Sequence, residues 1–331
     1  MRIMKASHRQ FASILAAALA LLGAEHAALA QDWPTRPITL IVTFAPGGTN
    51  DTVARILAAR MVDYLGQTIV VENVAGASGL TGAARVAKAA PDGYQLLLGD
   101  NGLFGTAPNM YRTLPYAVSD FTPVGLLVEL PLVLATRKDF PAATLEEFIA
   151  YTRTNQAKLQ YGSPGAGTVP HLACVILNSA LGLNVTHIPY RGGAPAMQDL
   201  IAGRIDYQCP IMPTVAPQLE GGRVKALASL TGRRSSLLPE LPSAQERGVD
   251  VDVSVWLALF LPKGAPPTVV RKLHDAAGMA MEAPAAAARL REVGADPVPS
   301  ERRSPEYLQK LIGSEIQKWS APIKASGISI E

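Results

Sequence analysis

The chain has 331 residues, and its 30 Lys and Arg against 27 Asp and Glu give a formal net charge of +3 at pH 7. This near balance gives no electrostatic case for binding nucleic acid or an anionic membrane surface. A chain of about 300 residues usually divides into two domains, and the sequence contains no solenoid repeat or low-complexity tract.

The first thirty residues are typical of a secretory signal peptide. A positively charged start is followed by an apolar run and then by small residues around a cleavage point. These segments are Arg2 with Lys5 and Arg9, then Phe11 to Leu22, then Ala28-Leu29-Ala30. The run is shorter than the ~20 residues of a membrane span, and Gln31 in place of Cys disfavours a lipid anchor. We predict cleavage after Ala30 and export to the periplasm. Because the leader carries three basic residues and one acidic residue, 27 basic and 26 acidic residues remain.

Strands and helices alternate after the leader, which indicates an α/β fold with mainly parallel sheets. Apolar, β-branched runs predict strands at 38–44, 68–72 and 94–98. Helical spacing of apolar residues predicts a helix over 53–65, and small residues predict another at 79–90. The long apolar run at 124–136, interrupted by Pro131, is interpreted as the strand that leaves a first lobe.

The second part of the chain alternates in the same way. We expect strands at 159–162, 185–189, 204–208 and 224–230, and helices at 144–155, after 168 and at 194–202. The apolar run 252–261 would return to the first lobe, and helices at 267–281 and 305–325 close the chain. We predict lobe 1 as residues 31–131 plus 258–331 and lobe 2 as 132–257. Two crossings form a hinge like that of periplasmic binding proteins.

Two loops share one design, Ala45–Asp51 and Ser163–Thr168. Each follows a predicted buried strand, contains two glycines and opens a helix. Glycines let the backbone approach a ligand, and the free N–H groups at a helix N-terminus favour an anion. Facing each other across a cleft, the loops would clamp a carboxylate. The alternative is that both are ordinary tight connections. We expect Asp51 to cap its helix or bond the loop, or to meet a ligand ammonium.

Other chemistry has weaker support. His171, His187 and His274 are not spaced for a metal, so we expect no metal and no cofactor. Ser163 and His171 could be imagined as a hydrolytic pair, but the nucleophile-elbow spacing and an orienting acid are missing, so we expect no enzyme. Otherwise His171 could face the cleft or have a capping or packing role. Cys174 and Cys209 could form a disulfide or be buried small hydrophobes.

Ordered blocks of sequence carry a family resemblance. They are Trp33-Pro34-Thr35-Arg36-Pro37-Ile38, Phe44 to Asp51, Val71-Glu72-Asn73, Ala87 to Tyr94, Gly167 to Leu172, His187 to Ala196, and Asp199 to Asp206. In these blocks the sequence resembles the tripartite tricarboxylate transporter receptors, also called Bug proteins. The resemblance covers essentially the whole mature chain.

The resemblance implies a type II periplasmic binding fold, a Venus flytrap of two α/β lobes joined by two crossing strands. Such a receptor would take a small carboxylate (mono-, di- or aromatic, or an amino acid) into the cleft. It would deliver the ligand to two membrane subunits of a secondary transporter. A ligand-sensing docking protein for a signalling system on the same fold is the alternative. We expect a monomer.

By position, the family's binding residues fall on three loops and one later acid. They are Pro46, Gly47, Gly48, Thr49 and Asp51 in the first loop, Ser163, Gly167 and Thr168 in the second, Asn101 in the third, and Asp206. Gly165 and His171 are added because they lie within and just after the second loop. Asp206 would line the cleft or hold strand ends. Members often have a second Asp shortly after Asp206; this chain has Tyr207 to Met212 there, which favours plain or aromatic carboxylates over amino acids.

Overall fold

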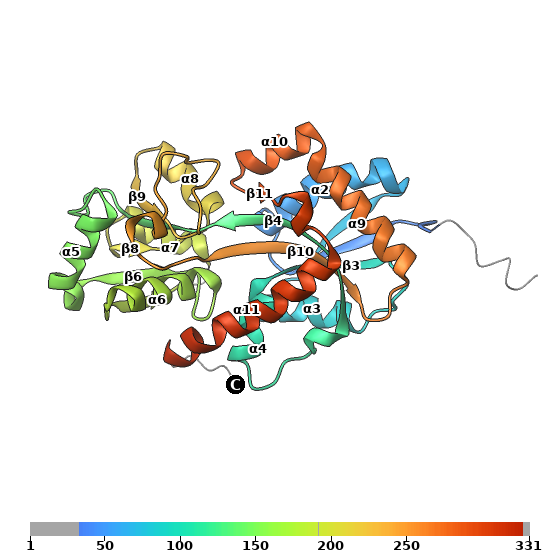
Figure 1. The fold of residues 1–331 in the computed structure, drawn as a ribbon, viewed down its shortest axis with the longest axis horizontal. Helices are drawn as coiled ribbons and strands as arrows, with labels where there is room; N and C mark the ends of the chain where they lie inside the picture. The colour runs from blue at the N-terminus through green and yellow to red at the C-terminus, as the bar shows by residue number, and fades with distance from the viewer. Residues whose placement is uncertain (1–32, 191, 327–331) are drawn as a thin grey trace, which may run out of the picture. The chain divides into compact units, whose positions relative to one another are not determined.

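The computed structural model describes residues 33–190 and 192–326. The predicted signal peptide and its cleavage point therefore lie outside the described residues. The described residues from Pro37 onward belong to one compact unit. Within this unit the chain forms two α/β lobes, each built around its own sheet (Figure 1).

The first lobe is built on a six-stranded mixed sheet in the order β11-β4-β10-β3-β1-β2. Its strands are β1 (Ile38–Val42), β2 (Ile69–Asn73), β3 (Gln95–Asp100), β4 (Phe121–Pro131), β10 (Ser254–Pro262) and β11 (Asp296–Pro297). β1 pairs in parallel with both β2 and β3, whereas β10 runs antiparallel to β3 and β4. The carboxyl ends of β1 and β3 therefore meet at one edge of the sheet.

The second lobe is built on a five-stranded sheet in the order β7-β6-β8-β5-β9. Its strands are β5 (Val133–Arg137), β6 (Gln160–Ser163), β7 (Thr186–Pro189), β8 (Tyr207–Gln208) and β9 (Val224–Ser229). β6 pairs in parallel with β7 and β8, and β5 runs antiparallel to β8 and β9. The predicted strand at 204–208 is reduced to its last two residues, and Gly203, with φ of 71°, lies in the turn that precedes it.

Helices cover the two sheets. They are α2 (Thr49–Leu65), α3 (Leu80–Ala87), α4 (Ala107–Met110), α5 (Leu145–Asn155), α6 (Val169–Leu181), α7 (Gly193–Ile201), α8 (Met212–Glu220), α9 (Pro267–Glu282), α10 (Pro284–Glu292) and α11 (Pro305–Ser326). Single turns are η1 (Ala77–Gly79), η2 (Gly102–Thr106), η3 (Val118–Asp120), η4 (Gln156–Lys158), η5 (Gln245–Arg247) and η6 (Ser300–Arg302). The predicted cap of α5 is present, since Thr144 accepts a bond from the Glu147 N–H. Helices α8 and α10 were not predicted.

The apolar run at 124–136 is not one strand. β4 ends at Pro131, Leu132 makes a single bridge to Ile211, and β5 begins at Val133 in the other sheet. The interruption at Pro131 thus marks the change of sheet, because proline cannot donate a ladder hydrogen bond. The chain returns through β10, which pairs along its length with β4. β10 lies wholly in the six-stranded sheet, and this includes its residues 254–257, which were predicted to belong to lobe 2. The residue at which one lobe ends and the other begins stays a prediction.

The core of the first lobe fixes the end of β3. Phe104 stacks on Phe260 with ring centroids 3.9 Å apart. A Cβ atom on Gly99 would lie 2.5 Å from Phe104, so only glycine fits at this position. The next residue, Asp100, ends β3. Among the described residues, no helix combines the length and apolarity that crossing a membrane requires.

Candidate functional site

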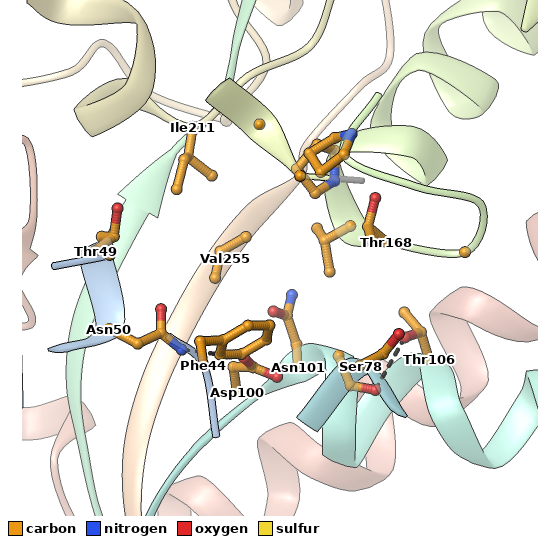
Figure 2. Close-up of a pocket in the computed structure, with 18 of the residues that line it drawn as sticks. Phe44, Thr49, Asn50, Ser78, Asp100, Asn101, Thr106, Thr168, Ile211 and Val255 are labelled. Atoms are coloured by element: carbon orange, nitrogen blue, oxygen red, sulfur yellow. Dashed lines mark hydrogen bonds between the residues drawn. The ribbon is translucent and has the colours of Figure 1, made fainter. Parts of the chain in front are cut away.

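A cavity of about 410 Å³ lies between the two lobes and is lined by residues of both. Its volume falls in the range of small-molecule sites. Figure 2 shows Thr168 and Ile211 of the second lobe opposite Asn50 and Asn101 of the first, with Val255 of β10 between them.

The first predicted loop brings the N-terminus of α2 to the cavity. Gly48, Thr49 and Asn50 line it. No side chain caps α2 at Gly48, so N–H groups of its first turn have no acceptor within the helix. The positive end of a 17-residue helix thus faces the cavity. Pro46 and Gly47 are exposed and are not among the lining residues.

Asp51 stabilises this loop from behind. Its carboxylate accepts bonds from the Gly47 N–H at 2.9 Å and the Asn73 side chain at 3.0 Å, and it pairs with Arg55 at 2.9 Å. The hydrogen bond from the Arg55 guanidinium holds the pKa of Asp51 below its ordinary value. Asp51 is buried and does not line the cavity, so its contacts are with the loop and not with a bound molecule.

The second predicted loop also reaches the cavity, through Gly167 and Thr168. Its N–H groups are largely used within the loop. Gly167 donates to Nδ1 of His171 at 3.1 Å, and Thr168 caps α6 by accepting from the His171 N–H at 3.4 Å. Ser163 and Gly165 lie behind the lining, where the Ser163 hydroxyl donates to the Gly165 carbonyl at 3.1 Å. This loop therefore offers fewer free donors than the sequence suggested.

A stacked pair of histidines supports the second loop. The rings of His171 and His187 lie 3.9 Å apart, and Nε2 of His187 is 2.7 Å from the Ser163 hydroxyl. Burial lowers the pKa of both side chains to about 4. The partner of Ser163 is thus His187 and not the imagined His171. Among the described residues, neither ring bonds a carboxylate, and the rings contact Ser163, Gly167 and each other.

The second lobe contributes two helix starts that the clamp prediction did not include. Gly192 and Gly193 line the cavity at the beginning of α7, and no side chain caps this helix. Pro210, Ile211 and Thr214 line it at the beginning of α8, which is likewise uncapped. Gly192 and Gly193 lie in the family block His187 to Ala196, and this was the one feature of the sequence that could have indicated their place in the site.

The third loop supplies the polar floor on the first lobe. Asp100 and Asn101 follow directly from β3 and both line the cavity. Asn101 was predicted, whereas Asp100 was not. Burial raises the pKa of the Asp100 carboxyl. Ser78 also lines the cavity and holds a φ of 54°, a left-handed conformation unusual for serine. Nothing in the sequence alone indicated its place.

Asp206 lies away from the cavity. Its carboxylate pairs with Arg137 at 3.1 Å and accepts the Gln160 N–H at 2.8 Å. These contacts tie the ends of β5 and β6 together. Two residues on, Gln208 reaches the cavity, and its side-chain nitrogen has no partner in the described structure.

A disulfide joins Cys174 in α6 to Cys209, with Cα atoms 5.6 Å apart. The structure thus decides between the two alternatives that the sequence left open. Because Gln208 and Pro210 flank Cys209 and both line the cavity, the disulfide fastens this wall to α6.

The described lining contains no Lys, Arg or His, and its one carboxylate is Asp100. Within residues 33–190 and 192–326, no group of three His, Cys, Asp or Glu side chains is placed to hold a metal ion. Anion binding in the described part of this cavity would depend on backbone N–H groups and neutral side chains.

Comparison with known proteins gives a consistent set of matches. The family model described as "Tripartite tricarboxylate transporter family receptor" matches residues 53–328. The solved structure of MatC from Rhodopseudomonas palustris, which carries bound malate, is 38% identical with a TM-score of 0.78, and the match covers 88% of this chain and 100% of MatC. Rpa4515 of R. palustris, solved with adipate, is 34% identical with a TM-score of 0.81 over 90% of this chain and 99% of that one. The periplasmic binding protein BugD is 37% identical with a TM-score of 0.79 over 90% and 100% of the two chains.

Proposed function

This chain belongs to the tripartite tricarboxylate transporter receptor family, and on that premise we propose that it captures a small carboxylate in the cavity between its lobes. The observation that carries the proposal is the pair of uncapped helix starts, α2 from one lobe and α7 from the other, at a single cavity. Each presents N–H donors and a partial positive charge. A carboxylate held between them would favour the closed arrangement of the lobes.

The relatives support this ligand class. MatC was solved with malate and Rpa4515 with adipate, and both ligands are carboxylates. We assign the binding role to Gly48, Thr49, Asn101, Gly167 and Thr168, the predicted residues that line the cavity. Pro46, Gly47, Asp51, Ser163, Gly165 and His171 would act by shaping the two loops.

We further propose the setting in which the receptor acts. The leader would be removed after Ala30, and the mature monomer would work in the periplasm without a cofactor and without catalysis. It would deliver its ligand to two membrane subunits of a secondary transporter. The lobes would correspond to residues 31–131 plus 258–331 and to 132–257.

The charge requirement is tested by substituting Gly48 at the start of α2. Its φ of −76° and ψ of 172° suit any residue, and an added Cβ meets nothing closer than 3.4 Å. We expect Gly48→Asp to cap the helix and to repel a bound carboxylate, while Gly48→Asn caps it without charge. Carboxylate affinity should fall at least about tenfold in the Asp variant relative to the Asn variant, equivalent to about 1.4 kcal/mol.

The measurement is calorimetry and thermal unfolding with mono-, di- and aromatic carboxylates and amino acids, with a neutral sugar as control. A ligand at 100 times its Kd should stabilise the native protein by about 2.7 kcal/mol. Equal affinities in the two Gly48 variants would remove α2 from the site. A sugar that binds while every carboxylate fails would overturn the proposed function.

A further inference from the structure

Asp100 places a buried acid in the wall of the cavity. It is the last residue of β3, its exposed fraction is 6%, and it lines the cavity. Its carboxylate accepts the Leu103 N–H at 3.0 Å and the Asn50 side-chain amide at 3.4 Å. Both are bonds that a carboxylate accepts, and they partly offset the effect of burial, which raises the pKa of this carboxyl. No cation in the described part of the chain pairs with it.

Asn101, the next residue, adds an unused acceptor. Its side chain is fully buried, and its Nδ2 donates to the Ser254 carbonyl in β10 at 2.8 Å. That bond fixes the amide orientation and leaves Oδ1 without a partner among the described residues. A buried acceptor without a donor is uncommon in native proteins, and this one belongs to a residue that lines the cavity.

The remaining lining defines what surrounds this polar pair. It is mainly apolar, with Phe44, Leu80, Met110, Ile211 and Val255 among its members. A bound molecule therefore contacts hydrocarbon over much of its surface and meets one anionic group. A plain dicarboxylate would place its second negative charge in a cavity that already holds Asp100, and the two would repel each other.

The acid lies close to the helix start that the proposed function assigns to the carboxylate. Asn50, in the first turn of α2, reaches Asp100 with its own side chain. The start of α2 and the acid are therefore linked through one asparagine side chain and one hydrogen bond. An α-amino acid carries its carboxylate and its amine on one carbon atom, so a single small molecule can present one charged group to each.

We propose that this cavity selects an α-amino acid with an apolar side chain, its ammonium bound by Asp100 and by Oδ1 of Asn101. The proposal rests on the proposed function, because the ligand carboxylate occupies the start of α2. The ammonium supplies a hydrogen-bond donor to the unpartnered Oδ1 of Asn101. It also places a positive charge beside the Asp100 carboxylate, which has no cationic partner among the described residues. The side chain packs against the apolar lining. This assignment departs from the expectation of a plain or aromatic carboxylate. That expectation was based on the missing second Asp after Asp206, and it did not include Asp100, which lines the cavity.

The test compares matched ligands by calorimetry on the oxidised mature protein. The pairs are leucine with 4-methylpentanoate and phenylalanine with 3-phenylpropanoate, which differ only in the amine, together with the N-trimethyl derivative of each amino acid. We expect at least one amino acid to bind about 30-fold tighter than its deaminated partner, as for a charge-assisted hydrogen bond. The trimethyl derivative, which has no N–H donor, should also bind more weakly than the amino acid.

The Asp100→Asn variant tests whether Asp100 causes the preference for the amino acid over its deaminated partner. The variant keeps the oxygen that accepts from Leu103 and loses the charge, so the ratio of the two affinities should fall to within about threefold. Asp63→Asn makes the same chemical change on an exposed part of α2 (69% side-chain exposure) and should keep the wild-type ratio. The ligand pairs need only wild-type protein, so the test stands even if Asp100→Asn does not fold.

The outcomes separate the two proposals. Deaminated acids or dicarboxylates that bind as tightly as every amino acid tested would overturn the amino-acid assignment and leave the carboxylate receptor intact. An unchanged ratio in Asp100→Asn would remove Asp100 from recognition. Failure of all carboxylates, amino acids included, would instead overturn the proposed function.

Discussion

The buried histidines behind the second loop carry no charge at neutral pH. Protonation of His171 at Nδ1 would remove the acceptor of the Gly167 N–H, and the charge would lie against the ring of His187 at 3.9 Å. The structure therefore favours the neutral forms. Their pKa values, about 4 in the folded protein, lie below the ordinary 6.5.

The first prediction concerns acid stability. Between pH 6.5 and about 4 the unfolded chain binds protons that the folded protein does not, so the free energy of unfolding should fall as the pH is lowered through this window. His171 alone would contribute up to about 3 kcal/mol. Urea unfolding at pH 7 and pH 4.5 measures the fall, and His171→Asn should make it shallower. An equal fall in both proteins would show that His171 does not control it.

Single residues also show where sequence reasoning stops. The Gly47–Gly48 loop could be predicted because strand, turn and helix are contiguous there. The partnership of Ser163 with His187 could not, because 24 residues separate them and their contact depends on how β6 pairs with β7. Asp100 was overlooked for a similar reason: its place in the site depends on the end of β3 facing α2 and on packing around Gly99.

At the scale of elements, periodicity located most strands and helices, since alternation of apolar segments is a local property. It failed where tertiary context decides. Residues 124–136 were predicted to form one strand, but they belong to two strands in different sheets. Helix α8, which contains Pro213 and Pro217, gave no helical signal, yet its start lines the cavity. The start of α8 was therefore beyond what spacing could predict, whereas α7 was predicted as a helix at 194–202 without its place at the cavity.

The disulfide gives an element-scale prediction. It links α6 to the residue after β8 across a sequence separation of 35, and a crosslink of this length should stabilise the fold by about 3 to 4 kcal/mol. The double substitution Cys174→Ala and Cys209→Ala should lower the free energy of unfolding by that amount and weaken ligand binding through Gln208 and Pro210. Wild-type protein in reductant serves as the matched control. Equal stability with and without the link would contradict this role.

On the scale of the molecule, the site exists only when both lobes contribute, because α2 belongs to one sheet and α7 to the other. A ligand that contacts both must favour the arrangement in which they approach. We predict that a carboxylate that stabilises the protein in thermal unfolding also lowers its radius of gyration in small-angle X-ray scattering. The Gly48→Asp variant should show no such change at the same ligand concentration. Tight binding to the wild type with an unchanged radius would exclude closure.

The pairing of β4 with β10 has a mechanical consequence for this motion. The two chain segments that connect the lobes continue from neighbouring strands of the first lobe, which are paired from Pro262 opposite Phe121 up to Ser254 opposite Pro131, where the chain crosses. Two separate tethers would allow the lobes to slide or twist independently, whereas a hydrogen-bonded ribbon resists shear between its strands. The lobes should therefore rotate about one axis across the ribbon. The starts of α2 and α7 would then meet in the same relative position at every closure, set by backbone pairing before any ligand arrives.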